Sequence, residues 1–266
     1  MTLKEIVKLT TSLGQRFIKD GLEYYIEDGM LAVSAIQKDM TAVNIAEEVE
    51  IIGDSAFVGC TNLKSMWAPS IKKIKSSAFF NCCNLVDVYL SSTLTSIGSL
   101  AFQGCIKLCK FDMPDSVKSL GGGVFSRCSE LKDISMSKGL NNIPLYTFSS
   151  CFGLSYISLP DTIVEIGEGA FYKCTNLTEI VFSKNLKKIS EQAFIGCFSL
   201  KEIDLLKGIQ VISAKAFCDC TMLERVYISN IVEYIGAFAF AGCHHLKHID
   251  IPDNVKLDKG AFPWLA

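Results

Sequence analysis

Apolar residues recur along this chain with a fixed period of 22–23 residues. In copy after copy a phenylalanine stands three residues before a cysteine, and a leucine stands three residues after it. The cysteines of this pattern are Cys60, Cys82, Cys105, Cys128, Cys151, Cys174, Cys197, Cys220 and Cys243. A further copy, without a cysteine, begins at Ala261-Phe262. Such a period predicts a solenoid, because one coil cannot bury its own apolar face and needs a stacked neighbour.

Each copy has a second layer of pattern that predicts its local structure. After Leu177, the apolar residues Ile180 and Phe182 alternate with outward positions, which is typical of a β-strand. A proline often closes this strand, where its missing N–H costs least. A second apolar pair, such as Ile163 and Ile166, predicts a short strand on the far side of the coil. The Ala-Phe segment between the strands is predicted to form one turn of α- or 3₁₀-helix.

The twelve cysteines could suggest a disulfide framework, but their spacing argues against one. Stacked copies of one side chain point the same way, and a bridge between them would need rotamers that disturb the packing. We therefore predict that the nine repeat cysteines are free, buried thiols that act as small apolar residues. Cys83, Cys109 and Cys218 lie outside the pattern and are the better candidates for reactive thiols.

The first part of the chain departs from the repeat and is predicted to cover the first coil. Residues 3–19 have apolar positions at helical intervals, which predicts an amphipathic helix. Two strand-like runs within residues 22–36 flank Glu27-Asp28-Gly29, a hairpin signal. We expect residues 1–52 to form an N-terminal cap and residues 53–266 to form the solenoid.

The repeated string Ile-Gly-x-x-Ala-Phe-x-x-Cys-x-x-Leu-x-x-Ile-x-Leu-Pro, as in Ile166 to Cys174 and Leu154 to Pro160, resembles the BspA-like leucine-rich repeat family. The resemblance covers residues 43–266. It implies an α/β-class, right-handed leucine-rich-repeat solenoid of about ten 22–23-residue coils. A concave parallel β-sheet, short helical turns and second short strands would make up each coil.

The resemblance also implies a function and a location. Members of this family are typically surface or secreted proteins, and several are associated with adhesion, so the implied partner is a protein such as a host matrix or cell-surface protein. However, the first residues carry charges without an uninterrupted apolar run, so no signal peptide is expected. Free cysteines would suit a reducing compartment, which leaves the location open.

Charge and hydropathy exclude two classes of partner. With 26 Lys+Arg against 28 Asp+Glu, the chain lacks the basic field that a nucleic-acid binder needs. It has no apolar run of the length that spans a membrane. We expect a monomer that binds neither nucleic acid nor a bilayer interior.

Candidate chemistry is sparse. The three histidines, His244, His245 and His248, lie in one copy, and no nucleophile motif or phosphate-binding loop accompanies them. Cys243, His245 and His248 could be imagined as zinc ligands, but Cys243 is a repeat cysteine expected to face inward and no fourth ligand is evident. The triple glycine 121–123 is more simply a loose turn than a phosphate cradle. We therefore expect no enzyme, no cofactor and no metal.

The better functional candidates are the outward-facing positions of the first strand in each coil. They are rich in acids and aromatics, and exposed Trp and Tyr on a rigid surface are typical interface anchors. The candidate partner-binding residues are Trp67, Tyr89, Asp112, Asp133, Tyr156, Glu179, Glu202, Asp204, Arg225, Tyr227, His248 and Asp250.

Three interpretations of this face stay open. It could be the surface of a protein-interaction or adhesion module, or of a carbohydrate-binding module that stacks sugar rings on its aromatics. It could also be an inert solvated face whose tyrosines merely suit a strand. The aromatics are spread over several coils, which favours a broad macromolecular contact over a single sugar cleft.

Overall fold

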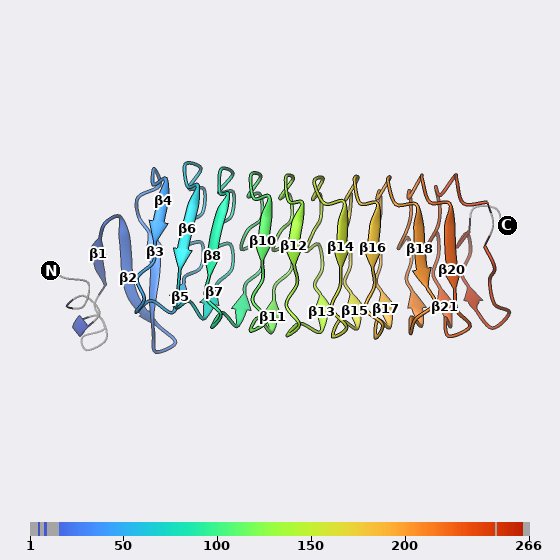
Figure 1. The fold of residues 1–266 in the computed structure, drawn as a ribbon, viewed down its shortest axis with the longest axis horizontal. Helices are drawn as coiled ribbons and strands as arrows, with labels where there is room; N and C mark the ends of the chain where they lie inside the picture. The colour runs from blue at the N-terminus through green and yellow to red at the C-terminus, as the bar shows by residue number, and fades with distance from the viewer. Residues whose placement is uncertain (1–4, 6–7, 10–15, 248, 263–266) are drawn as a thin grey trace.

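The computed structural model describes residues 5, 8, 9, 16–247 and 249–262, which form an elongated solenoid with two rows of short strands (Figure 1). The longer, main strands are β4 (Ala42–Asn44), β6 (Ser65–Ala68), β8 (Asp87–Leu90), β10 (Lys110–Asp112), β12 (Asp133–Ser135), β14 (Tyr156–Ser158), β16 (Glu179–Val181), β18 (Glu202–Leu205) and β20 (Arg225–Ile228). The second row comprises β5 (Ile51–Ile52), β7 (Lys73–Ile74), β9 (Ser96–Ile97), β11 (Ser119–Leu120), β13 (Asn142–Ile143), β15 (Glu165–Ile166), β17 (Lys188–Ile189), β19 (Val211–Ile212), β21 (Tyr234–Ile235) and β22 (Lys256–Leu257). Every pairing between coils is parallel, which confirms the predicted solenoid.

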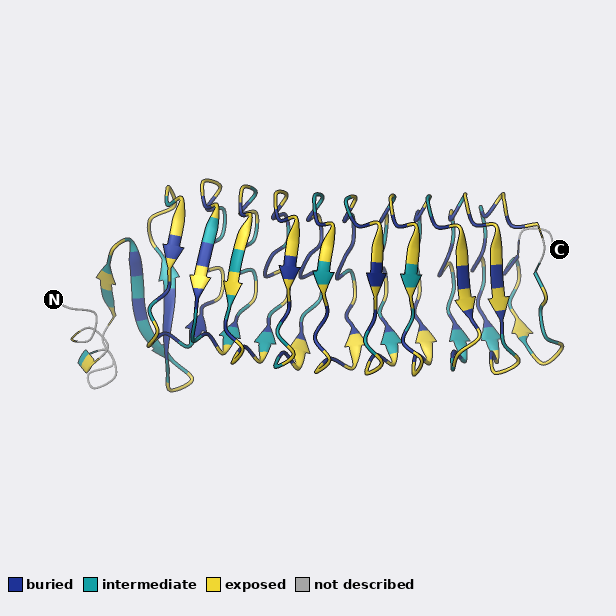
Figure 2. Ribbon diagram, viewed as in Figure 1, coloured by how far each residue is buried: buried dark blue, intermediate teal, exposed yellow. Residues whose placement is uncertain are grey.

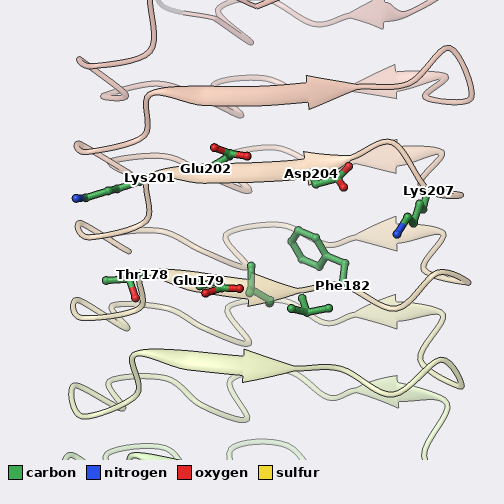
Figure 3. A pocket seen from close by; sticks show the side chains of 9 residues that line it. Thr178, Glu179, Phe182, Lys201, Glu202, Asp204 and Lys207 are labelled. Carbon is green, nitrogen blue, oxygen red and sulfur yellow. The ribbon is translucent and has the colours of Figure 1, made fainter.

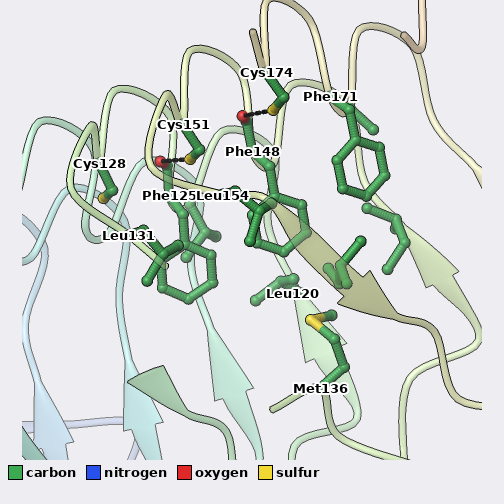
Figure 4. Close-up of a cluster of buried hydrophobic side chains, with 14 of the residues drawn as sticks. Leu120, Phe125, Cys128, Leu131, Met136, Phe148, Cys151, Leu154, Phe171 and Cys174 are labelled. Carbon is green, nitrogen blue, oxygen red and sulfur yellow. Dashed lines mark hydrogen bonds between the residues drawn. The ribbon is translucent and has the colours of Figure 1, made fainter. Parts of the chain in front are cut away.

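The core is a stack of phenylalanine rings that runs the length of the molecule. Neighbouring repeat rings lie nearly parallel, with centroids between 4.9 and 5.9 Å apart. The repeat leucines and cysteines stack beside them and are fully buried (Figure 4). Offset stacking of this kind adds to the burial of each large apolar ring. Each coil is therefore dry only because its neighbours cover it.

The repeat cysteines do more than fill space. The Cys174 thiol donates a hydrogen bond to the carbonyl of Phe148, one coil earlier, at 3.0 Å. The same carbonyl accepts the backbone N–H of Cys151 at 3.1 Å, so both of its lone pairs are used. A buried carbonyl needs such partners, and cysteine supplies a weak donor in an otherwise apolar side chain. The same thiol–carbonyl bond recurs at Cys82, Cys105, Cys128, Cys151, Cys197, Cys220 and Cys243.

The Ala-Phe segment differs from the expectation of a helical turn. In the coil of Phe171, the N–H groups alternate: that of Phe171 donates to Ala193 in the next coil at 2.7 Å, whereas that of Tyr172 closes a turn onto Gly169 at 2.9 Å. In a helix, every one of these N–H groups would donate to a carbonyl of the same segment. Here half of the amides serve as a third line of hydrogen bonds between coils, so the segment is a chain of reverse turns.

Two positions in each coil have left-handed backbone, which bends the chain at these turns. One lies five residues before the repeat cysteine and the other directly before it. The second position is glycine in several coils, but it is Arg127 (φ 61°) and Lys173 (φ 56°) in others. Left-handed backbone costs about 1–2 kcal/mol for a residue with a Cβ. The tight turns therefore store strain wherever glycine is absent.

A proline interrupts the row of second strands. In most coils the residue after the second strand donates its N–H to the preceding coil, as Gly167 does to Ile143 at 2.8 Å. Pro144 occupies this position in its coil and has no N–H to donate. The row is accordingly split between β11 and β13 into two sheets.

The N-terminal residues add an antiparallel hairpin to the end of the solenoid. Strand β2 (Leu22–Glu27) pairs antiparallel with both β1 (Phe17–Lys19) and β3 (Met30–Ala35). Strand β3 then pairs in parallel with β5, the first strand of the second row. The expected helix over residues 3–19 is wrong at its end, because β1 is pinned by pairing with β2; most of the remainder lies outside the described residues. We propose that residues 1–52 act as the cap, because Phe57 is fully buried although no repeat phenylalanine precedes it.

Removing one ring from the stack tests both the stacking and the cap. Phe171→Ala should lower the free energy of unfolding by about 3–5 kcal/mol, because it opens a cavity between two coils. Phe57→Ala should cost a similar amount if the N-terminal segment covers that ring. Phe198→Ala, which removes an exposed ring, is the matched control and should cost far less. Urea unfolding measures all three, and a small loss at Phe57 alone would contradict the cap.

The strain at the turn before the repeat cysteine can be measured at Lys173. Lys173→Gly should be more stable than Lys173→Ala by about 1 kcal/mol, because glycine adopts left-handed backbone without a steric penalty. Both variants remove the same long side chain, so their difference isolates the backbone. Thermal unfolding of the pair decides the point; equal stabilities would show that the turn is not strained.

Candidate functional site

The outward side chains of the main strands form one continuous face, called the main-strand face below. Exposed residues alternate with inward ones along each strand, as in Glu202 and Asp204 around buried Ile203 (Figure 2). The predicted outward positions are exposed wherever the structure describes the candidate residues. His248 is outside the described residues, so its position is not assigned.

Four aromatic side chains project from this face. Trp67, Tyr89, Tyr156 and Tyr227 are 44, 60, 49 and 41% exposed. Trp67 and Tyr89 are direct register partners on β6 and β8, so two of the four lie side by side. The four aromatics come from four different coils, and this pair occupies neighbouring ones. Tyr156 on β14 and Tyr227 on β20 are separated from them and from each other.

The charged side chains of the face are partly paired across coils. Lys110 contacts Asp112 at 3.2 Å and Asp133 at 3.9 Å, and the hydrogen bond that its ammonium donates to Asp112 raises the pKa of the lysine. Arg225 contacts Glu202 at 2.9 Å, and this carboxylate raises the pKa of the guanidinium. Glu179 and Asp204 form no ion pair with any described residue. The exposed acids thus include carboxylates without a cation of their own.

The main strands are hydrogen-bonded in groups, and the coils are thereby joined in pairs. β10 pairs with β12, β14 with β16 and β18 with β20, while β4, β6 and β8 form one group of three. No backbone hydrogen bond joins β8 to β10, β12 to β14 or β16 to β18, all of which the structure describes. The main-strand face is therefore interrupted wherever two neighbouring main strands do not pair. Each such place is called a step below.

The inward residues of β8, β12 and β16, the last main strands before a step, are partly exposed, whereas those of β20 are buried. The inward residues Ile134 of β12 and Ile180 of β16 are half-buried, whereas Phe111 of β10 and Ile157 of β14 are buried. Figure 2 shows this alternation as teal and dark-blue strand centres. Apolar side chains that point toward the core thus reach solvent where the neighbouring coil stands away.

Side chains at one corner of the coil join the coils of two pairs, β10–β12 and β14–β16. In the first coil of a pair, the main strand is followed by Pro114-Asp115, and in the second coil by Ser137-Lys138. The Lys138 N–H donates to Asp115 at 3.0 Å and the Lys138 ammonium pairs with the same carboxylate. These bonds lower the pKa of Asp115. The equivalent bonds from Lys184 to Asp161 join the next pair.

The step between β16 and β18 opens into a groove of about 420 Å³, shown in Figure 3. Ile180 and Phe182 form its apolar floor, and the Phe182 ring lies edge-on to Phe194 with centroids 6.0 Å apart. The remaining lining residues are Thr178, Glu179, Val181, Lys201, Glu202, Asp204 and Lys207. The groove therefore combines an apolar floor with a charged rim.

A second groove of about 360 Å³ lies beside β20. Its lining is mostly apolar and includes Leu206, Val226, Tyr227, Ile228 and Ile249, with Arg225 and Asp250 at the rim. Leu206 is 49% exposed. The first coil of this pair carries Leu206-Lys207 where the corresponding coils carry proline and aspartate. The β18 coil therefore departs from the repeat at Leu206 and Lys207, which line the second and the first groove, respectively.

The sequence contained a signal for the pairing that the repeat search missed. Apart from Leu206, proline and serine alternate after the main strand from Pro69 onward, and small and larger residues alternate before the cysteine. The copy with proline is the first coil of a pair and the copy with serine is the second, so this alternation indicates which coils pair. The grooves themselves have no comparable signal, because they depend on how far two strands stand apart.

Two of the three side chains considered as zinc ligands make other contacts. The Cys243 thiol is bonded to the Phe217 carbonyl, and Nδ1 of His245 lies 2.6 Å from the Thr221 carbonyl. Among the described residues no group of three or more His, Cys, Asp or Glu side chains could hold a metal ion. The described part of the chain also has no helix of the length and apolar character needed to cross a bilayer.

Comparison with known proteins identifies the repeat. The sequence profile for the BspA type leucine rich repeat region, described as six copies, matches residues 36–155 and 141–264. Together the two matches span most of the chain. The chain belongs to the BspA-type leucine-rich repeat family. A search of curated proteins found no match.

Solved structures of bacterial leucine-rich repeat proteins resemble this BspA-type chain. A leucine-rich repeat protein from T. pallidum has 22% identity and a TM-score of 0.54, and the alignment covers 88% of this chain and 91% of that one. A leucine-rich cell-surface protein from Faecalibacterium prausnitzii has 22% identity and a TM-score of 0.45, with 88% and 93% covered. One from Bacteroides ovatus has 20% identity and a TM-score of 0.42, with 91% and 99% covered. At this identity the T. pallidum structure supports the fold alone.

The thiols of this BspA-type protein should divide sharply by reactivity. Burial raises the pKa of Cys128 and Cys174 to about 12, so these thiols stay protonated at pH 8. Cys109 is exposed, and Cys83 and Cys218 are half-buried. A thiol reagent at pH 8 should label Cys109 first, Cys83 and Cys218 next, and the nine repeat cysteines only after unfolding. Mass spectrometry of labelled peptides measures this order; early labelling of Cys174 would contradict the buried stack.

Proposed function

We propose that this BspA-type leucine-rich repeat protein is a non-catalytic interaction or adhesion module that binds a protein through its main-strand face. The observation that carries the proposal is the set of four exposed aromatic side chains on that one face. Aromatic residues at interfaces supply a large contact area at low conformational cost, and they are over-represented among residues that dominate binding energy.

The rigidity of the face supports the same proposal. Its side chains project from strands held by hydrogen bonds within each pair and by the phenylalanine stack beneath, as for Tyr227 on β20 and Asp204 on β18. A surface ordered before binding loses little entropy when a partner docks. The length of the face also suits a macromolecule, because its candidate residues are distributed from β6 to β20.

One observation favours carbohydrate as the alternative ligand. Trp67 and Tyr89 are aligned on neighbouring strands, about 5 Å apart at the backbone. Two such side chains could together form a platform for a sugar ring. The other two aromatics have no aligned aromatic partner on the face, so this alternative concerns one end of the solenoid only.

Binding by a face variant separates these functions. The test presents the full chain to arrays of matrix proteins, cell-surface proteins and glycans. Changing Trp67, Tyr89, Tyr156 and Tyr227 to Ala should reduce protein binding at least about tenfold, because exposed anchors are lost while the core is untouched. Phe152→Ala with Phe198→Ala is the matched control, since these rings are 43 and 44% exposed in the turns after the repeat cysteines.

The outcomes distinguish the two ligand classes. Protein binding that is lost in the face variant and kept in the control supports the interaction module. Protein binding unchanged in the face variant would overturn it. Loss of glycan binding by Trp67→Ala with Tyr89→Ala, together with unchanged protein binding, would support the carbohydrate alternative. Thermal unfolding confirms that every variant is folded.

A further inference from the structure

The two grooves on the main-strand face are separated by two coils. One lies between β16 and β18, and the other lies beside β20 at the next step. The core rings give the advance per coil, with 5.0 Å between Phe171 and Phe194 and 5.0 Å between Phe194 and Phe217. Two such advances place the grooves about 10 Å apart along the axis of the core.

The groove between β16 and β18 has the features of a site for a long cationic side chain. Glu179 and Asp204 border it and form no ion pair with a described residue, whereas Glu202 forms an ion pair with Arg225. The floor of Ile180 and Phe182 suits the aliphatic stem of lysine or arginine, which buries its methylenes while its charge meets polar groups.

Two lysines lie at opposite ends of this groove. Lys201 stands at the start of β18 and points away from the centre, and Lys207 stands beyond the strand's end, near Asp204 (Figure 3). Neither forms an ion pair with a described residue. The middle of the groove is therefore acidic and its ends are basic. The carboxylates attract a bound cation to the centre, and the Lys207 ammonium repels that cation.

The groove beside β20 suits an apolar side chain. Leu206 and Tyr227 are exposed at its mouth, and Val226, Ile228 and Ile249 complete an apolar lining. Its neighbouring charges, Arg225 and Asp250, stand at the rim. A Leu, Ile or aromatic side chain that enters here removes apolar surface of both partners from water.

An extended polypeptide has the spacing that matches both grooves. Three residues of a polyproline II or extended chain advance about 9–10 Å, and in polyproline II every third side chain lies on the same side. We propose that the grooves beside β18 and β20 bind an extended basic segment of a partner protein, with Lys or Arg in the first groove and an apolar residue three positions away in the second. This inference rests on the proposed protein-binding function and specifies the chemistry of the partner.

Fluorescence anisotropy with short peptides tests the proposal on the full chain. The probe is a labelled, proline-rich peptide that contains Arg-Pro-Pro-Leu, together with its reverse order Leu-Pro-Pro-Arg. At least one should bind, more tightly at low salt, because its charge pairs are exposed. Three control peptides replace Arg with Glu, replace Leu with Ser, or shorten the spacing by one residue, and each should bind more weakly.

Charge variants locate the bound cation. Glu179→Gln with Asp204→Asn should raise the Kd of the Arg peptide about fivefold to tenfold, since two carboxylates lose their charge without losing their shape. Asp87→Asn with Asp133→Asn is the matched control, because it makes the same charge change on the same face outside both grooves. Lys207→Gln should lower the Kd, because it removes a competing charge. Tyr227→Ala should weaken binding through the second groove.

The results separate this inference from the proposed function. Equal binding of the Arg and Glu peptides, equal losses in the acidic variant and its control, or no binding at about 1 mM peptide would each overturn the inference. If the aromatic face variant still lost its protein partner on the arrays, the proposed function would stand and the partner would lie elsewhere on the face. Unchanged protein binding by the aromatic face variant would overturn both the proposed function and this inference.

Discussion

The fold depends on the stacking of one coil on the next through buried phenylalanine rings and the carbonyl groups beside them. A coil of 22–23 residues cannot enclose an apolar interior, so its inward ring is protected only between two neighbours. The Phe148 carbonyl shows how closely the polar and apolar requirements are linked, because it accepts both the Cys151 N–H and the Cys174 thiol. Cysteine satisfies both at one position, being small enough for the stack and able to donate to the preceding coil.

The same stack explains how the molecule presents a surface. Because the interior is continuous, the outward residues of the main strands need no role in stability, and their chemistry is free to vary from coil to coil. Trp67 and Tyr89 form an aromatic pair near one end, while Glu179, Glu202 and Asp204 border a groove toward the other. A uniform core with a varied face is the arrangement expected of a repeat protein that recognises a partner over several coils.

Because the coils are joined in pairs, this face is uneven. Asp115 and Lys138, and their counterparts Asp161 and Lys184, tie the first coil of a pair to the second. No corresponding main-strand bonds join β16 to β18, so the apolar floor of Ile180 and Phe182 becomes accessible at that step. The two grooves of this face therefore lie where main-strand pairing is absent, and the β18 coil, which departs from the Pro-Asp pattern, contributes residues to both.

The repeat period, the buried stack of Phe, Cys and Leu, the two strands per coil and the outward positions could all be inferred from the order of residues. They follow from local alternation and from a spacing that brings like side chains over one another. The helical turn was wrong, because half of the amides near Phe171 bond to the next coil. The coil pairs and the groove beside Phe182 were decided by the tertiary structure. The separation of two stacked strands depends on inward side chains and corner contacts from both coils at once, and no single copy of the repeat contains that information.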